Sequence, residues 1–66
     1  MIKIGNKYRY RFSIDSYECY RTGVTEHVIK ITFIRSGVYF YKIEGYPNVE
    51  EGHFEKNSYM FEQLEK

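Results

Sequence analysis

Apolar and polar residues alternate most regularly near the N-terminus, over residues 7–15. A period of two places the apolar side chains on one face of a β-strand and the polar side chains on the other. The apolar members of this segment are Tyr8, Tyr10, Phe12 and Ile14. The pattern therefore predicts a half-buried strand over residues 7–15, entered through a turn at Gly5-Asn6.

A second apolar stretch, residues 24–34, is rich in the β-branched side chains that favour strands. A short turn at residues 35–37 follows, and residues 38–44 alternate again, which predicts an antiparallel hairpin. Pro47 has no N–H and is expected to close the returning strand. In the strand over residues 24–34, the side chains of Ile29, Ile31 and Phe33 are expected to face the core.

The remaining segments carry weaker patterns. Residues 17–20 are expected to return as a short strand, and residues 49–56 to form a polar loop with one short edge strand. Asn57 or Ser58 is expected to cap a single helical turn. The chain is therefore predicted to be one all-β domain over residues 1–66. Its architecture would be a small antiparallel β-barrel of about five strands, with at most one short helical turn near the C-terminus.

A barrel of this size is filled by a limited set of side chains. The residues expected to fill it are Ile4, Tyr8, Tyr10, Phe12, Ile29, Ile31, Phe33, Tyr39, Tyr41, Ile43, Phe61 and Leu64. The aromatic residues left outside this set are Tyr17, Tyr20, Phe40, Tyr46, Phe54 and Tyr59.

The composition of the chain indicates the class of protein and its cellular location. Hydrophobic residues make up 42% and charged residues 29% of the chain, as in ordinary soluble domains. No apolar run approaches the length of about 18 residues that indicates a membrane helix, so no membrane partner is expected. The single cysteine, Cys19, cannot form an internal disulfide, which favours a reducing, cytoplasmic location. Aromatic residues are unusually frequent at 20%.

The formal net charge of +1 excludes a strongly basic nucleic-acid binder and a strongly acidic DNA mimic. The charges are unevenly distributed, because residues 1–42 hold eight Lys/Arg against three Asp/Glu. Residues 43–66 hold two Lys/Arg against six Asp/Glu. Either the two parts neutralise each other across neighbouring strands, or one basic face steers a partner.

No pattern of catalytic residues is found. A Cys–His nucleophile pair needs hydrogen-bond contact and a third orienting group, and nothing places Cys19 beside His27 or His53. Both histidines are expected to be surface or half-buried residues without chemistry. Glu50 and Glu51 have no recognisable metal-ligand spacing, and the glycines stand singly at turns. The sequence predicts no enzyme, no cofactor and no metal site.

Residues 4–10 (IGNKYRY) and the hairpin end at residues 39–45 (YFYKIEG) resemble small SH3-like β-barrels. A nearer resemblance is to short open reading frames of phages and mobile elements in Gram-positive bacteria. Those often open with a hydrophobic-Gly-x-Lys-Tyr turn and end with a Ser-x-Met segment, matched here by Ser58-Tyr59-Met60. Several phage proteins of similar size inhibit host defence systems by binding them. The resemblance therefore implies an SH3-like barrel and an anti-defence function.

Exposed tyrosines beside arginines are enriched in protein–protein hot spots, although some of the unplaced aromatics will act as lids over the barrel ends. We therefore expect a non-catalytic protein-binding module, a small adaptor or phage-encoded inhibitor that occludes a host protein. The residues expected to contact the partner are Arg9, Arg11, Tyr17, Tyr20, Arg21, Tyr46 and Phe54.

Two other functions stay open. Aromatic and basic residues interleave at residues 8–11, as in sites that stack bases and neutralise phosphates, but a strand sends the two kinds to opposite faces. A nucleic-acid-binding barrel would use the basic residues Lys7, Arg9, Arg11, Lys30 and Lys42. The other alternative is a structural subunit, a homodimer or larger homo-oligomer, that buries its aromatic surface against itself.

Overall fold

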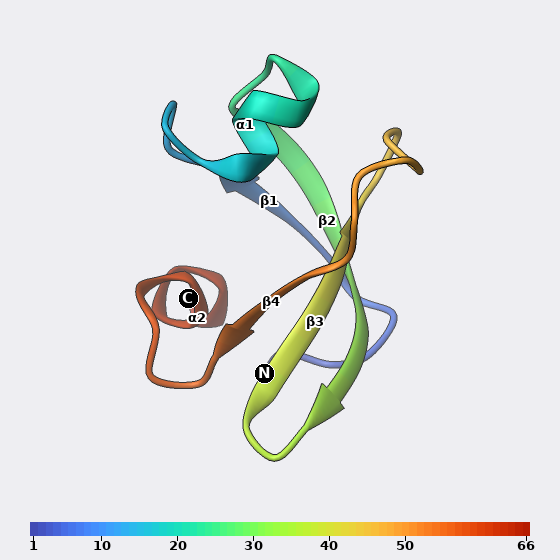
Figure 1. Ribbon diagram of the computed structural model, residues 1–66. Coiled ribbons are helices and arrows are strands. Elements are labelled where there is room, and N and C mark those ends of the chain that lie inside the picture. Colours follow the sequence, from blue (N-terminus) through green and yellow to red (C-terminus); the bar gives the residue numbers. More distant parts are fainter.

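Four strands and two short helices make up the protein in this computed structural model, which describes all 66 residues. The elements are β1 (Lys7–Arg11), α1 (Tyr17–Thr22), β2 (Glu26–Arg35), β3 (Val38–Ile43), β4 (Gly52–Glu55) and α2 (Tyr59–Glu65). The strands form one antiparallel sheet in the order β1-β2-β3-β4. Helix α1 lies at one end of this sheet and α2 lies beside β4 (Figure 1).

The hairpin of β2 and β3 confirms the prediction from the alternating pattern. Arg35 pairs with Val38, so the turn contains only Ser36 and Gly37. Both turn residues have positive φ, 51° and 77°. This is the backbone of a type I′ turn, whose twist matches that of the flanking strands.

A β-bulge in β2 reverses the side-chain alternation. Ile31 pairs with Tyr41, and Phe33 pairs with the adjacent Phe40. Thr32 is therefore an extra residue that has no pairing residue on β3. One extra residue moves every following side chain to the other face. Ile34 therefore packs against the core, while Phe33 is 49% exposed. The prediction that Phe33 faces the core is wrong for this reason.

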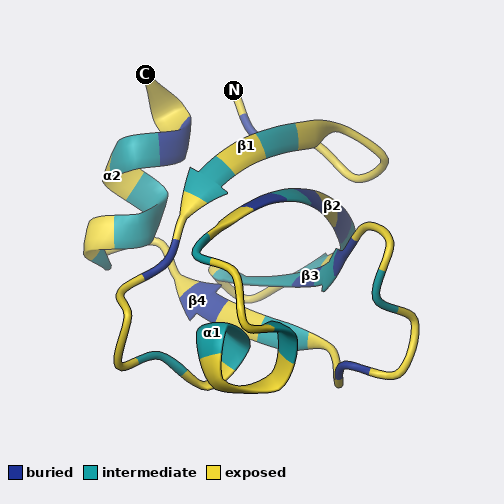
Figure 2. Cartoon of the chain, turned by 90° about the horizontal axis from the view of Figure 1, so that it is seen from above, coloured by how far each residue is buried: buried dark blue, intermediate teal, exposed yellow.

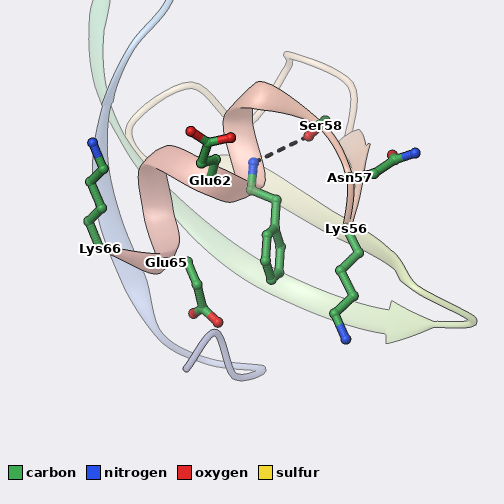
Figure 3. A pocket seen from close by; sticks show the side chains of 7 residues that line it. Lys56, Asn57, Ser58, Glu62, Glu65 and Lys66 are labelled. Carbon is green, nitrogen blue, oxygen red and sulfur yellow. Dashed lines mark hydrogen bonds between the residues drawn. The ribbon is translucent and has the colours of Figure 1, made fainter.

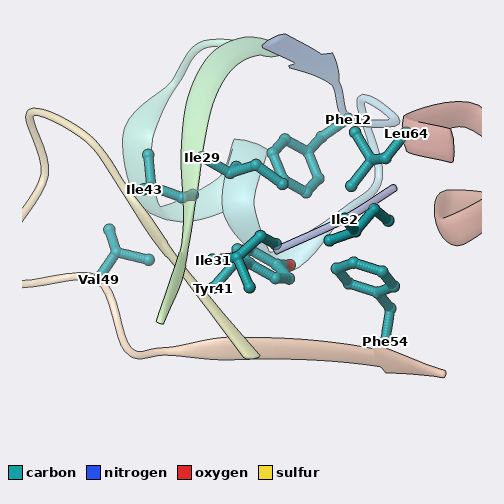
Figure 4. Packing of buried hydrophobic residues seen from close by; sticks show 9 residues of the cluster. All are labelled: Ile2, Phe12, Ile29, Ile31, Tyr41, Ile43, Val49, Phe54 and Leu64. Carbon is teal, nitrogen blue, oxygen red and sulfur yellow. The ribbon is translucent and has the colours of Figure 1, made fainter. Parts of the chain in front are cut away.

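The core lies on the inner face of the sheet (Figure 4). Its buried hydrophobic residues are Ile2, Phe12, Ile29, Ile31, Tyr41, Ile43, Val49, Phe54 and Leu64. Ile29 and Ile31 at the centre of β2 are fully buried. Figure 2 shows the buried positions of the strands on β2, β3 and β4, which identifies the middle of the sheet as the centre of the core.

The sheet is not closed, because β1 and β4 do not pair with each other. A barrel is therefore not confirmed, and the sheet has four strands where about five were expected. Ile2 and Leu64 join Phe12 and Phe54 in the buried cluster, so the N-terminal segment and α2 supply apolar cover from outside the sheet (Figure 4). The N-terminal amine also lies 3.5 Å from Glu65 of α2.

Both helices begin at serine caps. The hydroxyl oxygen of Ser16 accepts the N–H of Cys19, and Gly23 ends α1 with φ of 76°. The prediction of a strand over residues 17–20 is therefore wrong. The cap expected at Ser58 is confirmed, since its hydroxyl accepts the N–H of Phe61, although α2 spans seven residues rather than one turn.

Two further predictions are corrected at segment ends, and one is confirmed. The first strand stops at Arg11, and Ile14 is 79% exposed in the loop that follows. Ile4 lies before the strand and is 56% exposed, so it is not a core residue. The edge strand expected between residues 49 and 56 is confirmed as β4.

A close approach between Gly52 and Tyr41 sets the packing of the inner face. The two residues are partners across β3 and β4. A Cβ atom at Gly52 would overlap the ring of Tyr41, so the ring occupies the space that any other side chain would need. The same ring packs with Phe12 and Phe54, whose ring centroids lie 6.1 and 5.9 Å away.

The substitution Gly52→Ala is expected to lower the free energy of unfolding by about 1–3 kcal/mol, the usual range for overpacking a core. Urea unfolding measures this change. In a Tyr41→Leu background the same substitution should cost less, because the ring that blocks the Cβ is gone. Equal costs in the two backgrounds would contradict the packing described here.

Candidate protein-binding surface

Helix α1 brings three of the predicted contact residues together. Tyr17, Tyr20 and Arg21 are three and four positions apart and share one helix face, which we call the α1 surface. Tyr17 is 46% and Tyr20 84% exposed. Arg21 Nη1 donates to the Tyr17 hydroxyl at 2.7 Å, and the guanidinium carbon lies 5.7 Å from the Tyr17 ring centroid. The arginine is therefore both hydrogen-bonded to the tyrosine and close to its ring.

A second contact of Arg21 fixes the helix to the loop between β3 and β4. Arg21 Nη2 donates to the backbone oxygen of Asn48 at 3.3 Å. The two residues are 27 positions apart in the chain. The guanidinium is thus oriented by one side chain of its own helix and by one distant carbonyl group.

The other face of α1 is anchored to the sheet by Glu18. The Tyr41 hydroxyl donates to Glu18 Oε2 at 2.6 Å. Burial, followed by this hydrogen bond and the negative charges nearby, raises the pKa of Tyr41 far above its ordinary value. Burial also raises the pKa of Tyr10, with smaller contributions from Tyr59 and Glu18. Tyr41 therefore stays a neutral donor to Glu18 at physiological pH.

His27 supports the end of α1 and is buried, where a surface or half-buried position was expected. Its Nε2 lies 2.9 Å from the Val24 carbonyl oxygen and 2.8 Å from the Thr22 hydroxyl. A carbonyl oxygen can only accept, so Nε2 carries a proton and donates it. The imidazole also packs edge-on against Tyr46, with centroids 5.2 Å apart. These contacts give His27 a structural role.

The other predicted contact residues are not part of the α1 surface. Arg9 and Arg11 are exposed on β1, on the face of the sheet opposite the core. Tyr46 is half-buried against His27, with its ring in the core packing. Phe54 is only 6% exposed, because β4 turns its side chain inward, and it is corrected to a core residue.

Sequence reasoning missed one row of rings, in which Phe33 and His53 are exposed and Phe40 is half-buried. Phe33, Phe40 and His53 are neighbours across β2, β3 and β4 on the outer face. The ring centroids of Phe33 and Phe40 lie 6.0 Å apart, and those of Phe40 and His53 lie 5.9 Å apart. Strict alternation could not predict this row, because the bulge at Thr32 is what turns Phe33 outward.

The basic residues of the outer face are partly neutralised. Lys7, Lys30 and Lys42 are aligned across β1, β2 and β3. The amine of Lys7 lies 2.7 Å from a Glu44 oxygen, and the amine of Lys42 donates to the Val49 carbonyl at 2.9 Å. Two of the three ammonium groups therefore already have acceptors within the chain.

The surface of the protein has two hollows. One, of about 380 Å³, lies beside α2 and is lined by Lys56, Asn57, Ser58, Phe61, Glu62, Glu65 and Lys66 (Figure 3). Phe61 is its one apolar lining residue, and the hydrogen bond drawn there is the Ser58 cap. The other, of about 480 Å³, is lined by Tyr10, Arg11, Phe12, Ser13, Ile14, Thr25 and Tyr59.

Three further findings bear on the chemistry. No group of three or more His, Cys, Asp or Glu side chains is placed to hold a metal ion. No helix has the length and apolar character needed to cross a bilayer. Cys19, whose burial the sequence does not decide, is half-buried on α1.

Comparisons with protein-family models, with curated proteins and with solved structures found no match for this chain. The assignment of a site therefore rests on the geometry described above.

The raised pKa of Tyr41 predicts a loss of stability in alkali. A tyrosine whose folded-state pKa lies above its unfolded value contributes stability that is complete below about pH 10 and is lost as the pH rises further. The free energy of unfolding should therefore fall above about pH 10, and it should fall less in Tyr41→Phe. Urea unfolding at neutral and alkaline pH measures both. The exposed tyrosine variant Tyr20→Phe is the control and should keep the parent's pH dependence, whereas a Tyr41→Phe curve parallel to the parent's would contradict the prediction.

Proposed function

We propose that the protein is a non-catalytic protein-binding module that holds its partner through the α1 surface. One observation carries this proposal. Tyr20 and the hydrogen-bonded side chains of Tyr17 and Arg21 are exposed together on one short helix. Tyrosine and arginine are the residue types that dominate protein–protein hot spots. At 84% exposure Tyr20 contributes little to the core, so its ring is free to bury itself in a partner.

Preorganisation of the α1 surface further supports binding. Arg21 is held by the Tyr17 hydroxyl and the Asn48 carbonyl, and α1 is held by the bond from Tyr41 to Glu18. A side chain that is already ordered loses less conformational entropy on association. The surface therefore binds with a smaller entropic penalty than the same residues on a mobile loop.

The finer form of the proposal is a phage-encoded inhibitor that occludes a host defence protein, built on an SH3-like fold. The sequence resemblance supports this form. Occlusion requires only a surface that competes for a host site, and it makes no demand on catalytic groups or cofactors.

Replacing both Tyr17 and Tyr20 by Ala is expected to weaken partner binding by at least about tenfold, since hot-spot truncations cost about 2 kcal/mol or more. Affinity capture from host lysate, with and without nuclease and read by mass spectrometry, identifies the partner, and titration then measures its affinity. Tyr59→Ala, which removes a 70% exposed tyrosine from α2, is the control and should bind normally. Thermal unfolding checks that each variant is folded.

Unchanged binding by a folded Tyr17→Ala/Tyr20→Ala variant would contradict the assignment of the α1 surface. Capture that nuclease abolishes, with affinity falling steeply in salt, would instead favour a nucleic-acid ligand on the basic residues of the outer face. Recovery of the chain alone would favour the self-associating subunit.

A further inference from the structure

The outer face of β2, β3 and β4 has an ordered distribution of side chains. Its middle row is Phe33, Phe40 and His53, described above. A row at the turn end of the hairpin consists of Arg35, Val38 and Glu55. A row at the other end has Lys30 on β2 and Lys42 on β3. We call these three rows the outer patch.

Charge is separated across the outer patch. The β2 side carries the cations Lys30 and Arg35, and β4 carries the anion Glu55. Glu51 precedes β4, but its carboxylate accepts the hydroxyl of Thr32 and therefore reaches across to β2. The backbones of Arg35 and Glu55 are two strand spacings apart, about 10 Å, and no salt bridge joins the two side chains. The chain's two salt bridges, from the N-terminal amine to Glu65 and from Lys7 to Glu44, use none of these four groups.

We propose that the outer patch pairs face to face with the same patch of a second copy, around a two-fold axis parallel to β3. Such a rotation places β2 of one copy opposite β4 of the other. It brings Arg35 opposite Glu55 of the second copy. Phe33 then faces the second copy's His53, and the Phe40 rings meet at the axis. An isologous contact of this kind requires a self-complementary patch, and the opposite charges provide it.

The charges also select the direction of the axis. A two-fold axis perpendicular to the strands would place β2 opposite β2 and exchange the two outer rows. Arg35 of each copy would then face Lys30 of the other. Like charges would meet at both ends, so this arrangement is disfavoured.

Lys42 lies close to the proposed axis and would meet its own copy there. Its amine already donates to the carbonyl oxygens of Val49 and Pro47, at 2.9 and 3.4 Å. These bonds hold the ammonium group toward the loop after β3. The repulsion between the two lysines is therefore reduced.

The expected dimer is weak. The outer patch is three strands wide, about 14 Å, so the contact falls below the roughly 1,200 Å² of stable complexes. The dimer leaves the α1 surface free, because α1 is bonded through Glu18 to Tyr41 on the inner face. The inference is thus independent of the proposed partner of α1.

Analytical ultracentrifugation over a series of protein concentrations tests the proposal. The parent should show a reversible monomer–dimer equilibrium. Arg35→Glu and Glu55→Arg should each raise the dissociation constant at least about tenfold, since like charges then meet twice in each dimer. An equimolar mixture of these two variants should dimerise at least as well as the parent, because every pair in the mixed dimer has opposite charges.

Lys3→Glu and Glu62→Arg are matched controls, exposed outside the patch and carrying the same net charges as the test pair. Each should dimerise like the parent, and so should their mixture. Phe33→Ser should also weaken the dimer, whereas Ile14→Ser, at another exposed apolar residue, should not. A parent that stays monomeric at all concentrations would overturn the proposal. So would Arg35→Glu and Glu55→Arg variants that dimerise normally, or a mixture of them no better than its components.

Discussion

The hydroxyl and ring of Tyr41 connect the sheet to the helix that carries the candidate site. The ring fits over β4 because Gly52 has no side chain, and it packs with Phe12 and Phe54 in the core. Its hydroxyl then reaches Glu18. A six-residue helix is too short to persist in water by itself, so α1 depends on this bond and on its two caps.

The molecule consequently has two separate exposed faces. The α1 surface is made by Tyr17, Tyr20 and Arg21, on the helix bonded to the inner side of the sheet. The outer patch lies on the opposite side and combines aromatic rings with the cations Lys30 and Arg35 on β2 and the anion Glu55 on β4. Because only 66 residues are present, each face is built almost entirely from side chains that the small core does not use.

Local patterns predicted the parts of the fold that depend on neighbouring residues. The β2–β3 hairpin, the edge strand β4 and the cap at Ser58 follow from alternation and turn chemistry. The bulge at Thr32 could not be predicted, because it is a property of the pairing between two strands. Helix α1 was mistaken for a strand over its aromatic residues, although Ser16 and Gly23 mark its two ends. The aromatic excess drew attention to Tyr17 and Tyr20, and the structure shows that both are exposed. The contact of Arg21 with Asn48 joins distant segments and has no local signature.

The position of the Tyr41 side chain can be measured directly in a proton NOESY spectrum of the folded protein. The structure predicts cross-peaks from the Tyr41 ring to the α protons of Gly52 and to the side chain of Glu18. It also predicts that the ring current of Tyr41 displaces the Gly52 α-proton shifts. The absence of a cross-peak between the Tyr41 ring and Glu18 would contradict the claim that Tyr41 holds α1 on the sheet. Gly52 protons at ordinary shifts would contradict the packing of the ring over β4.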